Sequence, residues 1–198
     1  MELLSRILIL VFAYLLGSFP TALIYSRLTR GVDIRQLGDG NMGARNSKRQ
    51  FGWRAGILIA LSDILKGSLA ILLARELKFP VFWQYAAGTA VVLGHDFSIF
   101  ANFQGGQGFA VTTGVFLGLF TEWTLIGFGI YIVVYFTTRI SDLAAGLGMG
   151  FLFTTACIKG DSLFTLIFIV LVLLFIPLKK WIDRGRMKKY HGHLNMPI

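Results

Sequence analysis

The residues whose types and spacing could do chemistry gather in two glycine-rich segments. The first, residues 33–52, reads DIRQLGDGNMGARNSKRQFG, and the second, residues 94–108, reads GHDFSIFANFQGGQG. Glycines allow positive φ and let successive backbone N–H groups point into one concavity, where arginines and a helix N-terminus can complete a phosphate site. A flexible loop that is merely rich in glycine explains the first pattern equally well.

Within these segments Gly38, Gly40 and Gly43 allow positive φ, and we expect backbone that bends at the edge of a membrane helix around 105–108. His95 could donate a hydrogen bond to a phosphate or to a carbonyl oxygen. The alternative is an interfacial histidine that bonds to a nearby backbone carbonyl.

Asp63 and Lys66 lie three residues apart within an apolar stretch, so they share one helix face. Single charges at membrane depth are costly, which predicts that the two pair and face the interior of the bundle. The pair is either a structural staple or one wall of an active cavity, and we favour the cavity wall.

The elements that must position these residues are membrane helices. Hydrophobic residues make up 55% of the 198-residue chain and charged residues only 15%, against roughly 25% in soluble domains. We therefore expect an all-α, polytopic membrane protein that forms one domain over residues 1–198. The apolar runs predict about seven transmembrane helices, at 3–26, 54–74, 81–98, 110–121, 123–138, 143–158 and 162–178. The span at 110–121 is short for a bilayer of roughly 30 Å.

The net charge of +9 is concentrated in residues 27–54 and in the tail after Pro177. Cytoplasmic loops are rich in Lys and Arg, so both regions are predicted to be cytoplasmic and the N-terminus to lie outside. Because the basic clusters flank membrane spans, we expect anionic membrane lipids and no nucleic acid as partners. The one cysteine, Cys157, excludes an intrachain disulfide and a cysteine metal cluster, and we expect neither a metal nor another cofactor.

Taken in order, the motifs resemble those of the acyl-phosphate-dependent glycerol-3-phosphate acyltransferase family, the PlsY type. The similarity covers about residues 14–113, and Ser141 stands where the family has a serine. The matching motifs are Gly17-Ser18-x-Pro20, Asp33-Ile34-Arg35, the run from Gly38 to Asn46 with Arg49, Asp63-x-x-Lys66-Gly67, Gly94-His95-x-Phe97-Ser98 and Phe103-x-Gly105-Gly106-x-Gly108.

This resemblance implies a monomeric enzyme of the bacterial cytoplasmic membrane. Its reaction would transfer an acyl chain from acyl phosphate to the 1-hydroxyl of glycerol 3-phosphate, giving lysophosphatidic acid and phosphate. His95, Arg49, Lys66 and Ser141 would then take part in catalysis without a covalent nucleophile. The substrate-binding residues would be Arg35, Gly38, Asp39, Gly40, Asn41, Gly43, Arg45, Asn46, Gln104, Gly105, Gly106, Gln107 and Gly108.

The sequence departs from the family pattern at charged positions. Asp39 stands in place of a serine and Arg45 in place of a threonine, while Gln104 and Gln107 replace two lysines. Arg45, together with Lys48, is expected to restore part of the lost positive charge. The tail also has Leu178 and Trp181 where the family has His and Asn.

Three hypotheses follow from these observations. The first is the acyltransferase of the family, and the second is a divergent member with another acceptor or a lipid-binding role. The third is an unrelated transporter, which the intramembrane pair would suit, although the chain lacks the inverted repeat common in such folds.

Overall fold

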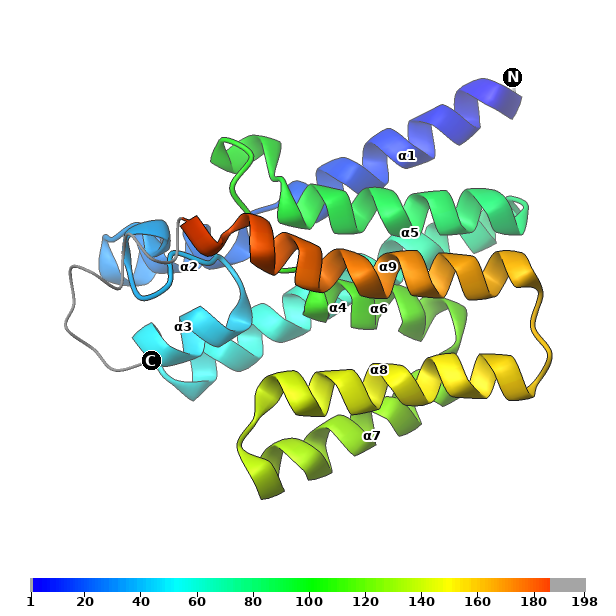
Figure 1. The fold of residues 1–198 in the computed structure, drawn as a ribbon. Coiled ribbons are helices and arrows are strands. Elements are labelled where there is room, and N and C mark those ends of the chain that lie inside the picture. Colours follow the sequence, from blue (N-terminus) through cyan, green and yellow to red (C-terminus); the bar gives the residue numbers. More distant parts are fainter. Residues whose placement is uncertain (1, 186–198) are drawn as a thin grey trace.

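The computed structural model describes residues 2–185, and that part of the chain is helical throughout, with no strand among the described residues (Figure 1). The all-α prediction is confirmed. The longer helices are α1 (Glu2–Ser18), α4 (Trp53–Glu76), α5 (Val81–Asp96), α7 (Thr121–Thr138), α8 (Ser141–Ile158) and α9 (Leu163–Ile182), with shorter helices α2 (Thr21–Arg30), α3 (Ala44–Phe51) and α6 (Phe109–Leu119) and 3-10 turns η1 (Ile34–Gln36) and η2 (Ile99–Ala101).

Four stretches are long and apolar enough to cross a bilayer, namely Glu2–Arg30, Trp53–Glu76, Ser141–Ile158 and Leu163–Ile182. Large apolar side chains cover the outside of the bundle, as lipid requires and water does not. Helix α6 has only 11 residues, which confirms that this element is too short to span a bilayer unaided. The number of spans and their orientation stay predictions.

The first predicted span, 3–26, is wrong as one continuous helix. Helix α1 ends at Ser18 and α2 begins at Thr21, because Pro20 has no N–H to donate to the carbonyl of Leu16. The break leaves carbonyl groups outside the regular helical ladder. The Ser18 carbonyl accepts from the Ser98 hydroxyl, and the Phe19 carbonyl accepts from Lys66 Nζ at 2.7 Å. The proline therefore creates acceptors at membrane depth.

Glycines set the closest helix crossings. A Cβ at Gly17 would lie 2.1 Å from the Val91 carbonyl oxygen, where α1 meets α5, and one at Gly67 would lie 2.2 Å from the Val111 carbonyl oxygen, where α4 meets α6. No larger side chain fits at either crossing. These contacts hold the second halves of α1 and α4 close to α5 and α6, which carry the second glycine-rich segment between them.

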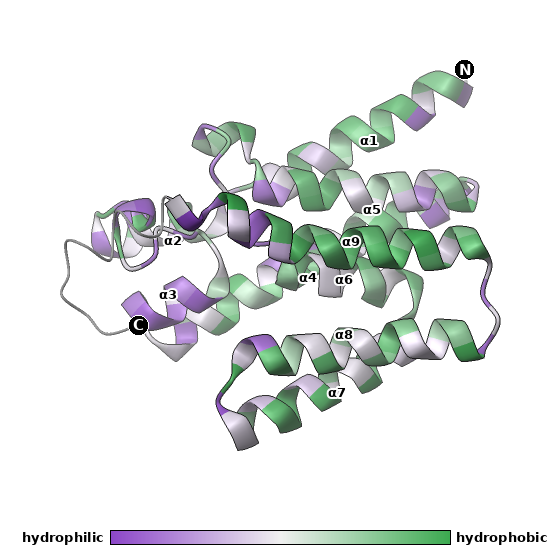
Figure 2. Ribbon diagram, in the orientation of Figure 1, coloured by the Kyte–Doolittle hydropathy of each residue, from purple (hydrophilic) through white to green (hydrophobic). Residues whose placement is uncertain are grey.

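One end of the bundle is polar. Helices α2 and α3 and the C-terminal end of α9 lie together there, and hydrophilic residues are concentrated at the same end (Figures 1 and 2). The two basic regions that were predicted to be cytoplasmic therefore lie at the same end of the bundle in the described residues, and the side of the membrane that this end faces stays a prediction. Of the predicted basic tail, Arg186, Lys188 and Lys189 lie outside them.

Candidate active site

A small polar pocket lies at the α1–α2 break, about 210 Å³ in empty volume. It is lined by Gly17, Ser18, Phe19, Pro20, Thr21, Met42, Asp63, Lys66, His95, Ser98 and Gly106. These residues come from the first helix pair, from α4, from α5 and from both glycine-rich segments. The pocket is therefore the place where the separate sequence motifs meet.

Lys66, Asp63 and His95 lie together in the lining of this pocket. Lys66 Nζ donates to Asp63 Oδ1 at 2.9 Å, and the two side chains are only 6% and 2% exposed. His95 Nδ1 lies 3.5 Å from the same Asp63 oxygen. The predicted pairing of Asp63 with Lys66 is confirmed, and the same carboxylate lies close to the imidazole ring. A buried charge needs such partners because water cannot solvate it.

The other ring nitrogen of His95 faces the second glycine-rich loop. A Cβ at Gly106 would lie 2.0 Å from His95 Nε2, and one at Gly105 would lie 2.1 Å from the His95 carbonyl oxygen. The Gly106 N–H donates to that carbonyl at 3.1 Å. Both glycines thus allow the loop to close over the histidine. At Gly108 a φ of +76° turns the chain into α6, which agrees with the predicted bend.

Gly38 and Gly40 have φ of +59° and +69°, so both adopt the left-handed backbone that glycine allows. Gly43 has a φ of −93° and does not. The loop's amides also differ from an open cradle, because Asp39 Oδ1 accepts from the Asn41 N–H at 3.1 Å and Asn41 Oδ1 from the Gly43 N–H at 2.6 Å. Side chains of the loop therefore occupy two of the amides expected to face a phosphate.

Asn46 ties this loop together from α3. Its Nδ2 donates to the carbonyls of Leu37 and Asn41, at 3.0 and 2.9 Å, while its buried Oδ1 has no partner among the described residues. Arg35 lies farther along, donating to Asp33 and, at 3.2 Å, to the Ala101 carbonyl, which links the first glycine-rich segment to the second. Two predicted binding residues thus shape the loops in this structure.

The Arg35 guanidinium holds the pKa of the Asp33 carboxyl at about 2, below its ordinary value of 3.8. Hydrogen bonds from the Arg35 side chain are the largest cause of this lowered pKa, opposed by burial. The pair keeps η1 in place at the polar end of the bundle.

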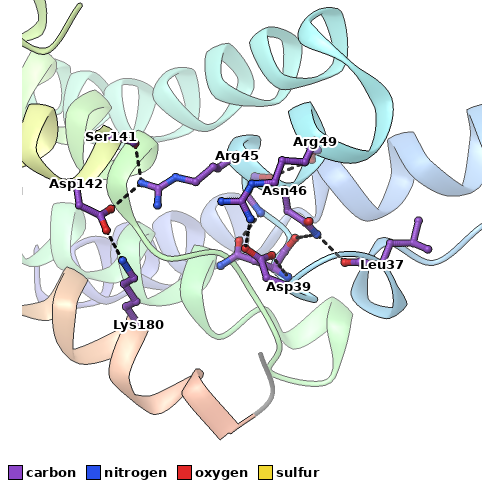
Figure 3. A network of polar contacts seen from close by, with 11 residues as sticks. Leu37, Asp39, Arg45, Asn46, Arg49, Ser141, Asp142 and Lys180 are labelled. Atoms are coloured by element: carbon purple, nitrogen blue, oxygen red, sulfur yellow. Dashed lines mark hydrogen bonds and ion pairs between the residues drawn. The ribbon is translucent and has the colours of Figure 1, made fainter. Parts of the chain in front are cut away.

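Cations and carboxylates alternate in a polar network that joins the first glycine-rich loop and α3 to the start of α8 and the end of α9 (Figure 3). This network, called the rim below, comprises Asp39, Arg45, Arg49, Ser141, Asp142 and Lys180. Arg49 donates to Asp39 at 3.2 Å. Arg45 donates to Ser141 Oγ at 2.8 Å and to Asp142 Oδ1 at 3.0 Å, across from α3 to the start of α8. The predicted site residues therefore divide into a buried group around His95 and a rim group around Arg45. No reason to connect Arg45 with Asp142 could be read from the chain, since they are 97 positions apart.

Lys48 does not contribute to the rim in the way expected of it. Its Nζ donates to the Tyr135 hydroxyl at 2.7 Å and lies 3.6 Å from the centre of the Trp53 ring. Lys180, which was expected only to mark the cytoplasmic side, instead bonds to Asp142 at 2.5 Å. Gln104 and Gln107 lie half-buried in the loop that carries Gly105 and Gly106.

Comparison with known proteins identifies the family. Residues 7–188 match the family model described as glycerol-3-phosphate acyltransferase. This chain belongs to the glycerol-3-phosphate acyltransferase family. The acyltransferase is 41% identical over 140 residues to the glycerol-3-phosphate acyltransferase of Prochlorococcus marinus (strain NATL1A), covering 71% of each chain. It is 36% identical over 175 residues to glycerol-3-phosphate acyltransferase 2 of Bacillus anthracis, covering 88% of this chain and 92% of that one.

A solved structure extends the likeness to three dimensions. The acyltransferase superposes with a TM-score of 0.83 and 28% identity on the crystal structure of PlsY, an integral membrane glycerol 3-phosphate acyltransferase, in its glycerol 3-phosphate form. The match covers 93% of this chain and 92% of that chain. A second structure, of the lysophosphatidic acid form, gives a TM-score of 0.80. The predicted PlsY-type family and membrane character are confirmed, and an unrelated transporter is excluded.

Proposed function

We propose that this acyltransferase transfers an acyl chain from acyl phosphate to the 1-hydroxyl of glycerol 3-phosphate, giving lysophosphatidic acid and phosphate. The observation that carries the proposal is the convergence of Lys66, His95 and Gly106, from the apolar helix α4, from α5 and from the second glycine-rich loop, on one polar pocket. A pocket so placed suits a reaction between a lipid-borne group and a small anion from water. We further propose a multi-pass arrangement in the bacterial cytoplasmic membrane with the rim facing the cytoplasm.

The roles of the buried residues follow from their contacts. Lys66 is fixed by Asp63 and by the Phe19 carbonyl, so its positive charge stays near the pocket and favours negative charge that develops on a phosphate or carbonyl oxygen. His95 has Nδ1 on the side of Asp63 and Nε2 on the side of the loop at Gly106, and we infer that Nε2 contacts a reacting oxygen. Positioning the two substrates next to each other supplies the remainder of the rate acceleration.

No covalent nucleophile is required in this scheme, since an acyl phosphate is already activated and its phosphate can accept the proton of the attacking hydroxyl. A small apolar pocket lies between α6, α7 and α8, where apolar side chains would contact part of an acyl chain. Phe109, one of its lining residues, directly follows Gly108, so the apolar pocket begins where the second glycine-rich loop ends.

The test is phosphate release by purified protein given palmitoyl phosphate and a panel of acceptors, with products identified by mass spectrometry. We expect release that depends on glycerol 3-phosphate and a product acylated at the 1-hydroxyl. Turnover of an uncharged alcohol or an amine, without turnover of glycerol 3-phosphate, would refute the assignment. That outcome would favour the second candidate, a divergent acceptor, which the pairing of the rim arginines with Asp39 and Asp142 supports.

A further inference from the structure

Asp142 binds two cations that come from different parts of the chain. Its Oδ1 accepts from Arg45 of α3 at 3.0 Å, and its Oδ2 accepts from Lys180 of α9 at 2.5 Å (Figure 3). Arg45 also donates to the neighbouring Ser141 hydroxyl. One carboxylate of the rim network therefore occupies a point where a guanidinium, an ammonium and a hydroxyl converge.

These three charged side chains are open to water. The exposed fractions are 41% for Arg45, 59% for Asp142 and 42% for Lys180. By contrast, the Lys66–Asp63 pair is 6% and 2% exposed. Exposed ion pairs contribute little and exchange partners readily, whereas separating a buried pair leaves an unsolvated charge. An incoming anion can therefore replace Asp142 as the partner of Arg45 and Lys180.

A phosphate monoester is a better partner for these two cations than a single carboxylate. It carries nearly two negative charges and three acceptor oxygens, so it can bond to a guanidinium fork and an ammonium together. Gln104 and Gln107 of the second glycine-rich loop carry no charge. Arg45 and Lys180, from α3 and α9, can offer their charge to a phosphate when Asp142 releases them.

We propose that Asp142 is an internal competitor that occupies Arg45 and Lys180 and is displaced by the phosphate group of a substrate. Asp142 thereby sets the affinity of the rim for phosphate and is a specificity-determining residue. This inference rests on the proposed function, because it takes the phosphate to belong to glycerol 3-phosphate or to the acyl phosphate. Steady-state kinetics with each substrate varied separately distinguish the two sources.

The test is Asp142→Asn, which keeps the side-chain shape and removes the charge. We expect KM for the phosphate substrate that binds here to fall about fivefold, because exposed ion pairs are weak and the substrate no longer has to displace one. The value of kcat should be nearly unchanged. Inhibition by inorganic phosphate should strengthen by the same factor. Lys180→Met should raise that KM, and in the Lys180→Met background the gain from Asp142→Asn should shrink, because one of the released cations is gone.

Glu122→Gln is the matched control, since it makes the same change in net charge at the opposite end of α7. It should leave both KM values unchanged. A fall in KM confined to one substrate supports the exchange and assigns its source. An unchanged or raised KM in Asp142→Asn, with wild-type thermal stability, would overturn the inference.

A binding measurement separates this inference from the proposed function. Inorganic phosphate should raise the Tm of Asp142→Asn at lower concentrations than it raises the Tm of the wild-type protein. If the wild-type protein fails to acylate glycerol 3-phosphate while this Tm difference is present, the proposed function fails and the phosphate exchange stands. Equal phosphate dependence of Tm in both proteins would overturn the exchange itself.

Discussion

Gly106→Ala is expected to disable the site through one methyl group. The added Cβ would begin 2.0 Å from His95 Nε2, and real Cβ contacts essentially never fall below 3.0 Å, so the ring must move by about 1 Å. That movement takes His95 away from Asp63 or from the reacting oxygen. A misplacement of about 1 Å can cost on the order of 100-fold in rate, equivalent to about 2.7 kcal/mol of transition-state stabilisation.

The assay is phosphate release from palmitoyl phosphate in the presence of glycerol 3-phosphate, read as kcat/KM. Gly146→Ala is the control, because a Cβ at that helical glycine meets nothing within 4 Å. Its activity and Tm should match the wild-type values. Comparable extraction yields for both variants would show that Gly106→Ala still folds.

A double-mutant cycle with His95→Ala then isolates the contact between the two residues. Once the ring is gone, the methyl group at position 106 has no imidazole to displace, so Gly106→Ala should cost no more than about twofold in the His95→Ala background. A full loss in that background, or retention of more than a third of the activity in Gly106→Ala alone, would refute the reasoning.

The remaining predictions concern buried and exposed charges, the absence of an acyl-enzyme, and topology. Lys66→Met should destabilise the protein by about 3 kcal/mol, because it leaves Asp63 buried without its cation, and Lys66→Met combined with Asp63→Asn should recover part of the lost Tm. The pKa of Asp33 is lowered to about 2, so its ion pair stabilises the fold above pH ~4 and that stability is lost as the pH falls toward 2; a pH series of Tm measurements should show a smaller acid loss in Asp33→Asn. Cys157→Ser should retain full activity, and finding a radiolabelled acyl group on the protein would contradict a mechanism without an acyl-enzyme. In that cysteine-free background, a cysteine at Lys78 should react with an impermeant reagent added to intact cells, and protection there would reverse the predicted orientation.

The sequence by itself determined those features that depend on neighbours along the chain. The apolar runs specified where helices form because a helix in lipid must satisfy its backbone internally. The spacing of Asp63 and Lys66 placed both on one helix face, so their pairing could be foreseen. Pro20 carried the signal for the break in the first helix, since proline cannot donate to the preceding turn, but the surrounding apolar residues suggested one continuous span.

Only the tertiary structure decided which distant segments touch. The approach of His95 to Gly106 and to Asp63 depends on how α4, α5 and the second glycine-rich loop cross, and helical periodicity carries no information on such crossings. Asp142 illustrates the same limit, because its partners are 97 and 38 positions away and come from separate helices. Glycine spacing was likewise insufficient, since Gly67 sits in a tight crossing while Gly146 faces open space. Local spacing fixes the faces of a helix, and the packing of whole helices selects which of those faces meet.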